Sequence, residues 1–243
     1  MGTPVKPYNQ DDSKKQQVAQ MFNNISHRYD FLNHFLSMGI DHIWRRKAIG
    51  ILRKESPKHI LDIATGTGDF AIAALKLHPE KVTGIDISVG MLEKGREKMK
   101  KRGYDNRVEM LEGDSENLPF ADASFDAITV GFGVRNFENL EKGLGEMLRV
   151  LRPGKTAVIL EFSKPRRFPV KQSFNFYSRR VIPFIGRTIS KDKAAYTYLP
   201  ESVEAFPEGK DFLRILEKVG YTDVKAKTVS GGIATIYTGH KSR

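Results

Sequence analysis

The sequence predicts an α/β protein with a seven-stranded mixed sheet and helices on both faces of that sheet. From residue 59 to residue 162, short apolar runs of strand length alternate with longer stretches of helical periodicity. Such alternation is typical of parallel strands joined by helices that cover both faces. Near the C-terminus, two more strand patterns are separated only by Ser230-Gly231-Gly232, a link that indicates an antiparallel hairpin.

The expected elements form a single domain over residues 1–243, because this length suits one α/β core. Residues 1–56 contain two apolar series at helical spacing, around Met21 and around Ala48, and are expected to form a helical N-terminal cap. Strands are expected at 59–64, 81–86, 107–111, 125–132, 155–162, 222–229 and 232–240, and helices at 69–78, 88–102, 139–150 and 211–220.

Residues 164–205 interrupt this alternation with a basic, aromatic insertion that contains no clear strand. Nine lysines and arginines and one acid between residues 164 and 193 give that stretch a net charge of +8, out of +11 for the chain. Five aromatic residues are interleaved with these charges: Phe168, Phe174, Phe176, Tyr177 and Phe184. Such a surface suits an anionic partner, and charge alone does not distinguish an anionic membrane from a nucleic acid.

The composition excludes several kinds of chemistry. The chain has no cysteine, so disulfides, thiolate nucleophiles and cysteine-ligated metals are excluded, and a reducing cytosol is favoured. Its six histidines are scattered, so we expect no metal site. The polar start has no apolar core of a signal peptide, and no apolar run approaches the ~18 residues that a membrane-spanning helix needs.

The strongest local motif is ILDIATGTGDFAIAA at residues 60–74. Gly66 and Gly68, with Thr67 between them, follow a strand and precede a helix, so the backbone can approach a ligand closely and offer it unpaired N–H groups. The same pattern fits two kinds of cofactor. Asp86 lies 20 residues after Gly66, where a carboxylate of an NAD-binding protein would accept from the ribose.

Three features favour S-adenosylmethionine over a nicotinamide dinucleotide. Asp62, just before the turn, can face the positive amino-acid part and sulfonium of S-adenosylmethionine but would repel a pyrophosphate. Asp114, after the third strand, is placed to accept from an adenine amino group, with Ser115 beside it. The terminal hairpin is typical of methyltransferases. With this cofactor Asp86 becomes the acceptor for the ribose hydroxyls, and Gly131 at the end of the fourth strand is expected to contact the cofactor.

Three further stretches resemble one family, the ubiquinone/menaquinone biosynthesis C-methyltransferases. TVGFGVRN (129–136) resembles the family's fourth-strand motif, and YDFLNHFLSMGIDHIWR (29–45) and RVLRPGKTAVILEFSKP (149–165) resemble its two longer signatures. With the glycine turn these stretches span most of the chain. Asp41 and Lys155 depart from the residues usual in the family, a histidine and a glycine. The resemblance implies a class I, Rossmann-like methyltransferase fold with S-adenosylmethionine as methyl donor.

The resemblance also implies the substrate, a 2-polyprenyl-1,4-naphthoquinol (demethylmenaquinol), and the last methylation of menaquinone biosynthesis. Ala64-Thr65 before Gly66 resembles the menaquinone-only members. Because a polyprenyl quinol resides in the bilayer, we expect a cytoplasmic protein that associates peripherally with the anionic cytoplasmic membrane through residues 164–205, and no nucleic-acid partner. The sequence leaves the oligomeric state open, a homodimer included.

Three residues are expected to act in catalysis. Arg135 is expected to stabilise the developing naphtholate oxygen, because a guanidinium is always protonated and therefore a poor base. Tyr29 is expected to hydrogen-bond the quinol hydroxyl. Proton removal is assigned to water, Asp30, Asp41 or His27, and these alternatives stay open.

Other functions also stay open at this point. A methyltransferase of this fold can act on a ubiquinone-precursor benzoquinol, a sterol, a small phenol or RNA, although cysteine-dependent methylation of pyrimidines is excluded. A nicotinamide-dependent oxidoreductase would use the same glycine turn, but Asp62, Asp86 and Asp114 argue against it. A non-catalytic scaffold that binds S-adenosylmethionine is disfavoured by the intact Arg135-Asn136 pair.

Overall fold

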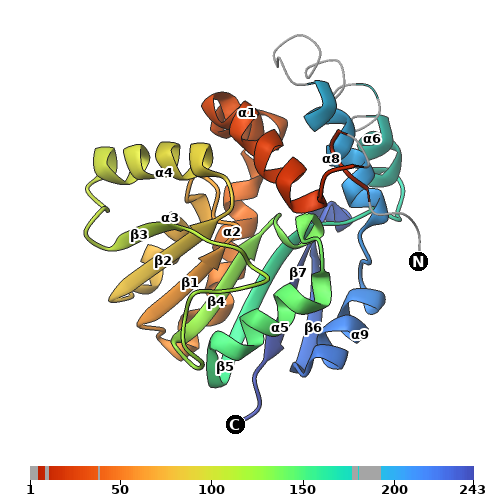
Figure 1. Ribbon diagram of the computed structural model, residues 1–243. Coiled ribbons are helices and arrows are strands. Elements are labelled where there is room, and N and C mark those ends of the chain that lie inside the picture. The colour runs from red at the N-terminus through yellow and green to blue at the C-terminus, as the bar shows by residue number, and fades with distance from the viewer. Residues whose placement is uncertain (1–4, 9–10, 38, 177–179, 181–192) are drawn as a thin grey trace.

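The computed structural model describes residues 5–8, 11–37, 39–176, 180 and 193–243. Its centre is a seven-stranded sheet in the order β3-β2-β1-β4-β5-β7-β6 (Figure 1). The strands are β1 (His59–Ile63), β2 (Lys81–Asp86), β3 (Val108–Glu112), β4 (Phe125–Gly131), β5 (Leu151–Phe162), β6 (Thr222–Val229) and β7 (Ala234–His240). The first five strands are parallel, and β7 runs antiparallel to both β5 and β6. The predicted mixed sheet with its terminal hairpin is confirmed.

Helices cover both faces of the sheet. The described helices are α1 (Lys14–Leu36), α2 (Ile40–Leu52), α3 (Asp69–Ala74), α4 (Val89–Arg102), α5 (Leu140–Val150), α6 (Val170–Phe176), α8 (Lys193–Ala205) and α9 (Lys210–Val219). One core cluster joins α2, α3 and α4 to the sheet, and the other joins α5 and α9 to its opposite face. In β1, Ile60 enters the first cluster, whereas Leu61 and Ile63 enter the second, because successive strand side chains point to opposite faces.

The observed strands and helices lie within a few residues of the predicted ones, with one larger difference. Strand β5 begins at Leu151, four residues before the predicted start at residue 155. Its first residue pairs with Phe125, and the register of β4 shifts between Phe125 and Ala127. Such an irregularity lets a strand continue past residues that would break a regular ladder.

The N-terminal segment divides into two helices with different surroundings. In α2, Trp44, Ala48 and Leu52 lie in the main core, and Trp44 Nε1 donates a hydrogen bond of 2.8 Å to Ser230 Oγ in the hairpin turn. Helix α1 instead contributes side chains to a pocket at the carboxyl ends of the strands. The division into a cap over residues 1–56 therefore stays a prediction, with α1 as the part that lies at the pocket.

The insertion is described only in part. Its described segments include the helices α6 and α8, whereas Tyr177, Phe184 and several of the predicted basic residues lie outside the described residues. Val18 and Met21 of α1 pack with Ala195 and Tyr198 of α8 in a small separate cluster. Among the described helices, none has the length and apolar character needed to cross a bilayer.

Replacing Phe212 by alanine should destabilise the protein strongly. Phe212 is fully buried in α9. The centroid of its ring lies 5.0 Å from that of the Phe206 ring and 4.8 Å from that of the Tyr237 ring. A Phe→Ala change at such a site costs about 3–5 kcal/mol of unfolding free energy, measured by urea denaturation. The matched control is Phe176→Ala, because Phe176 is 67% exposed and its loss should change stability by less than about 0.5 kcal/mol. Equal effects of the two variants would contradict the described packing of α9.

Candidate active site

A pocket lies at the carboxyl ends of β1, β2 and β4 and beside the loop that follows β3. Its empty volume, including the open mouth, is about 650 Å³, which is within the range of small-molecule and cofactor sites. Helix α1 and the start of α4 complete its wall. The predicted site residues that line the pocket are Tyr29, Gly66, Asp86, Asp114, Ser115 and Gly131.

The glycine turn takes its shape from left-handed backbone conformations. Ala64, Gly66 and Gly68 have φ angles of 51°, 56° and 86°. The two glycines adopt this region at little cost because they have no Cβ, whereas Ala64 adopts it despite its Cβ. The turn is tied to the end of β2, since the backbone N–H of Gly66 donates to Asp86 Oδ2 at 2.8 Å. The N–H of Thr65 likewise donates to the carbonyl oxygen of Ile85 at 2.9 Å.

Asp86 is held in one orientation at the pocket wall. Its Oδ1 accepts from the backbone N–H of Ser88 at 2.9 Å, while its Oδ2 accepts from Gly66. Burial raises the pKa of Asp86, and these two amide hydrogen bonds oppose that rise. Ser88 caps α4, because its Oγ accepts from the N–H of Met91 at 3.3 Å.

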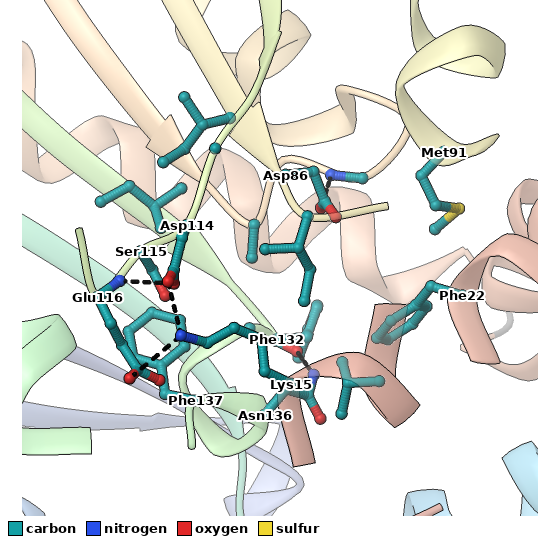
Figure 2. A pocket seen from close by; sticks show the side chains of 18 of the residues that line it. Lys15, Phe22, Asp86, Met91, Asp114, Ser115, Glu116, Phe132, Asn136 and Phe137 are labelled. Carbon is teal, nitrogen blue, oxygen red and sulfur yellow. Dashed lines mark hydrogen bonds and ion pairs between the residues drawn. The ribbon is translucent and has the colours of Figure 1, made fainter. Parts of the chain in front are cut away.

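Asp114 is paired with a lysine that the sequence analysis did not identify. Lys15 Nζ lies 2.6 Å from Asp114 Oδ2 and 3.5 Å from Glu116 Oε2, and its chain extends along the pocket wall (Figure 2). Burial lowers the pKa of Lys15, but the carboxylates of Asp114 and Glu116 together outweigh this and raise it. Asp114 Oδ1 accepts from the N–H of Glu116 at 2.9 Å. A carboxylate has about four acceptor positions, so Asp114 keeps capacity for a further donor.

Asp62 is buried beneath the turn and is not part of the pocket lining. Its two oxygens accept hydrogen bonds from Thr65 Oγ1 at 2.6 Å and Thr129 Oγ1 at 2.7 Å. Burial raises its pKa to about 6, although the two hydroxyl hydrogen bonds oppose the rise. In this arrangement Asp62 ties the turn to β4, and its direct contact with a cofactor stays a prediction.

Thr67 and Gly68 also lie outside the pocket lining. The hydroxyl of Thr67 donates to Asp30, whose carboxylate also pairs with Lys98 at 2.5 Å. Lys98 in turn lies 3.0 Å from Asp69. Asp30 is therefore engaged in a polar cluster that joins α1 to the glycine turn and α4. Its predicted part in catalysis is not supported by a place at the pocket wall.

Helix α1 is fixed over the strand ends by two more sets of hydrogen bonds. Lys14 Nζ donates to the carbonyl oxygens of Arg135 at 2.8 Å and Phe137 at 3.1 Å. Burial and the neighbouring Arg135 lower the pKa of Lys14 to about 8. Asn23 Oδ1 accepts from Ser88 Oγ at 2.7 Å and from the N–H of Gly90 at 2.9 Å. Phe22 and Tyr29 of the same helix line the pocket.

Arg135 forms a buried ion pair. It lies in the short 3₁₀ helix η3 (Val134–Asn136), and its Nη1 is 2.7 Å from Oε1 of the fully buried Glu161 at the end of β5. The same Nη1 donates to the carbonyl oxygen of Phe132. Its Nε is buried and has no hydrogen-bond partner. Burial raises the pKa of Glu161, and Arg135 opposes that rise.

The pocket lining includes Asn136, the neighbour of Arg135, but not Arg135 itself. Figure 2 shows Asn136 beside Lys15 and Phe137. Tyr29 lines the same pocket, and burial raises its pKa to about 12, so its hydroxyl is protonated at neutral pH. The other two bases considered from the sequence differ in exposure. Asp41 is buried and paired with Arg45, whereas His27 is exposed.

Sequence reasoning assigned no site role to four residues of this region: Lys15, Glu116, Asn136 and Tyr198. Lys15 and Glu116 belong to its wall, and Glu116 Oε1 also accepts from the N–H groups of Glu138 and Asn139 at 2.9 and 3.0 Å. Tyr198, on α8, contacts Asn136. Only Asn136 had a signal, its place in the fourth-strand motif. Among the described residues no group of three or more metal-ligating side chains occurs.

Known proteins resemble this chain in sequence and in fold. The model of the ubiE/COQ5 methyltransferase family matches residues 10–241. The chain is 52% identical to the demethylmenaquinone methyltransferase of Bacteroides fragilis over 98% of this chain and 97% of that protein. It is 44% identical to a ubiquinone/menaquinone biosynthesis C-methyltransferase of Geobacter sulfurreducens over 94% of this chain and 90% of that protein.

Solved structures share the fold at low sequence identity. An S-adenosylmethionine-dependent methyltransferase of Thermotoga maritima has a TM-score of 0.65 at 18% identity, covering 93% of this chain and 100% of that one. The [4+2]-cyclase SpnF has a TM-score of 0.62 at 16% identity, covering 99% and 98%. These similarities concern the fold alone, because one fold supports different reactions. The sequence matches decide the family: this chain belongs to the ubiE/COQ5 methyltransferase family.

Proposed function

We propose that this protein is an S-adenosylmethionine-dependent C-methyltransferase that converts a demethylmenaquinol to menaquinol. The observation that carries the proposal is the 52% identity, over nearly the full length of both chains, to a protein named demethylmenaquinone methyltransferase. The relative from Porphyromonas gingivalis with the same name is 45% identical over 98% of both chains.

The pocket fits S-adenosylmethionine in its residue types. Two carboxylates, Asp86 and Asp114, stand at the ends of neighbouring strands and suit the ribose hydroxyls and the adenine amino group. Ile87 and Met91, which line the same pocket, offer an apolar surface for the adenine. When bound, S-adenosylmethionine supplies an electrophilic methyl group.

Arg135 is the residue that we propose to stabilise negative charge on the acceptor oxygen. Its charge is permanent, and its Nε has no hydrogen-bond partner in the structure. The carboxylate of Glu161 holds the guanidinium in place from the side of β5. Preorganised charge of this kind lowers the barrier because nothing has to reorient as the ring oxygen becomes anionic.

Water, and not the carboxylates considered from the sequence, removes the proton of the acceptor hydroxyl in this proposal. Asp30 pairs with Lys98, and Asp41 is buried against Arg45, so neither faces the pocket as a free base. Tyr29 stays protonated at neutral pH, since burial raises its pKa to about 12. Its hydroxyl therefore suits hydrogen bonding to the acceptor better than proton abstraction.

We further propose that the described part of the insertion meets the membrane that carries the quinol. Phe168 and Phe176 are 80% and 67% exposed. The exposed basic residues Arg167 and Lys171 lie in the same segment as these two aromatic rings. Exposed aromatic rings beside basic groups suit an anionic leaflet, and each basic residue near the surface contributes on the order of 1 kcal/mol.

Calorimetric titration should show heat of binding with S-adenosylmethionine and none with NADH. Asp86→Asn should weaken S-adenosylmethionine binding about 10- to 100-fold, because a charged acceptor is lost. The matched control is Asp126→Asn: Asp126 also accepts two backbone N–H groups, from Lys58 and His59, but does not line the pocket. The control should leave S-adenosylmethionine affinity unchanged. NADH binding without S-adenosylmethionine binding would overturn the proposed cofactor.

Removing Arg135 should strongly lower turnover of demethylmenaquinol. The test also neutralises its partner Glu161, so that a loss of stability is not mistaken for a loss of catalysis. Arg135→Leu alone leaves Glu161 buried and unpaired, which costs about 3–5 kcal/mol of stability. The informative comparison is therefore Arg135→Leu/Glu161→Gln against Glu161→Gln. The double variant should lose about 10²- to 10³-fold in kcat and keep its affinity for S-adenosylmethionine. Equal kcat values in the two variants would leave Arg135 with a structural role only.

Binding to anionic vesicles should depend on the segment around α6. In a flotation assay with vesicles that contain phosphatidylserine, Arg167→Gln/Lys171→Gln should weaken binding about 30-fold, which corresponds to two basic residues. Phe168→Ala/Phe176→Ala should weaken it as well. Ile43→Ala, which changes a half-exposed apolar residue on α2, is the control and should have no effect. Unchanged binding by both double variants would refute docking through this segment.

A further inference from the structure

Helix α8 buries a tyrosine against the wall of the pocket. Tyr198 is 3% exposed and packs with Val18 and Met21 of α1. Its hydroxyl lies 3.1 Å from Oδ1 of Asn136, which lines the pocket. This hydrogen bond joins the insertion to the short helix η3 that follows β4, and the two residues are 62 positions apart in the chain.

The surroundings of Asn136 determine which way its amide faces. Its Nδ2 is 3.5 Å from the carbonyl oxygen of Phe132, a group that can only accept. With the amide reversed, Oδ1 would face that carbonyl oxygen and the two acceptors would repel each other. Oδ1 therefore faces Tyr198, and the phenol must donate. Burial raises the pKa of Tyr198 to about 12, so this donor keeps its proton at neutral pH.

The Nδ2 group of Asn136 then has donor capacity left for the pocket. An amide nitrogen carries two hydrogens, and the contact with Phe132 is longer than the 2.7–3.2 Å typical of N–H···O hydrogen bonds. Such a donor suits an acceptor oxygen, above all one that gains negative charge, and is unfavourable to an amine N–H. This chemistry agrees with a quinol as methyl acceptor.

We propose that Tyr198 is a positioning residue for methyl transfer: by donating to Asn136 Oδ1, it turns Nδ2 of Asn136 toward the ring oxygen of the quinol. This inference rests on the proposed function. The insertion then has two roles. Its helix α8 packs on α1, and its Tyr198 orients the Asn136 Nδ2 donor at the pocket. Without the phenol hydroxyl, only the longer contact with the carbonyl oxygen of Phe132 holds the amide of Asn136, so its Nδ2 is fixed less firmly toward the quinol oxygen.

Tyr198→Phe tests the proposal because it removes only the hydroxyl. We expect kcat for demethylmenaquinol to fall about 10- to 100-fold, with S-adenosylmethionine affinity unchanged in calorimetry. The matched control is Tyr221→Phe, since Tyr221 is also buried and its hydroxyl donates to the carbonyl oxygen of Leu144 at 3.2 Å, away from the pocket. That control should lower the melting temperature and leave kcat unchanged.

A double-mutant cycle with Asn136 separates positioning from mere packing. If Tyr198 acts through Asn136, Tyr198→Phe causes no further loss of kcat in an Asn136→Ala background. Asn136→Asp, which keeps the shape and removes the donor, serves if the alanine variant does not fold. An equal loss in both backgrounds, or full kcat in Tyr198→Phe, would overturn the inference alone. A wild-type protein without any methyl transfer would overturn the proposed function and the inference together.

Discussion

The pair of hydrogen bonds that Asp86 accepts from Gly66 and Ser88 is the constraint on which the pocket depends. Through them the end of β2 holds the glycine turn after β1 and the first turn of α4 in one arrangement. Burial disfavours the charged carboxylate, and the two N–H donors offset that cost. The group that fixes the loops is thus also an acceptor at the pocket wall.

Helix α1 is held over the pocket by ion pairs and hydrogen bonds more than by apolar contacts. Lys15 pairs with Asp114, Lys14 donates to the loop after β4, and Asn23 caps α4 from outside. The apolar cluster between α1 and α8 is small. A closure held by a few polar contacts is easier to open than a packed core, because each exposed ion pair contributes little. A large quinol requires such access.

A shared fold and membership of a sequence family support different statements about function. The [4+2]-cyclase SpnF shares this fold at 16% identity, so the fold by itself does not decide the reaction. Family membership and the residues of the pocket narrow the choice. Arg135 pairs with the buried Glu161, and Asn136 is hydrogen-bonded to Tyr198. Arg135 and Asn136 are neighbours in η3, which follows β4.

The sequence by itself determined the order of strands and helices, the terminal hairpin and the place of several pocket residues. Alternating apolar runs predict parallel strands, and the carboxyl ends of parallel strands meet at one edge of the sheet. Gly66, Asp86 and Asp114, which follow such strands, therefore had to lie close together, as they do. The left-handed turn at Gly66 was equally local, because glycine adopts it at little cost.

Only the tertiary structure decided which polar groups are paired. Lys15 and Asp114 are 99 positions apart, and Tyr198 and Asn136 are 62 apart. Their pairing depends on how α1 and α8 pack across the strand ends. The placement of Asp62 beneath the turn follows from the pairing of β1 with β4, and that of Asp30 against Lys98 from the packing of α1 on α4. Periodicity in a sequence indicates which face of a helix is buried, but hydrogen-bond partners follow from the position of that helix in three dimensions.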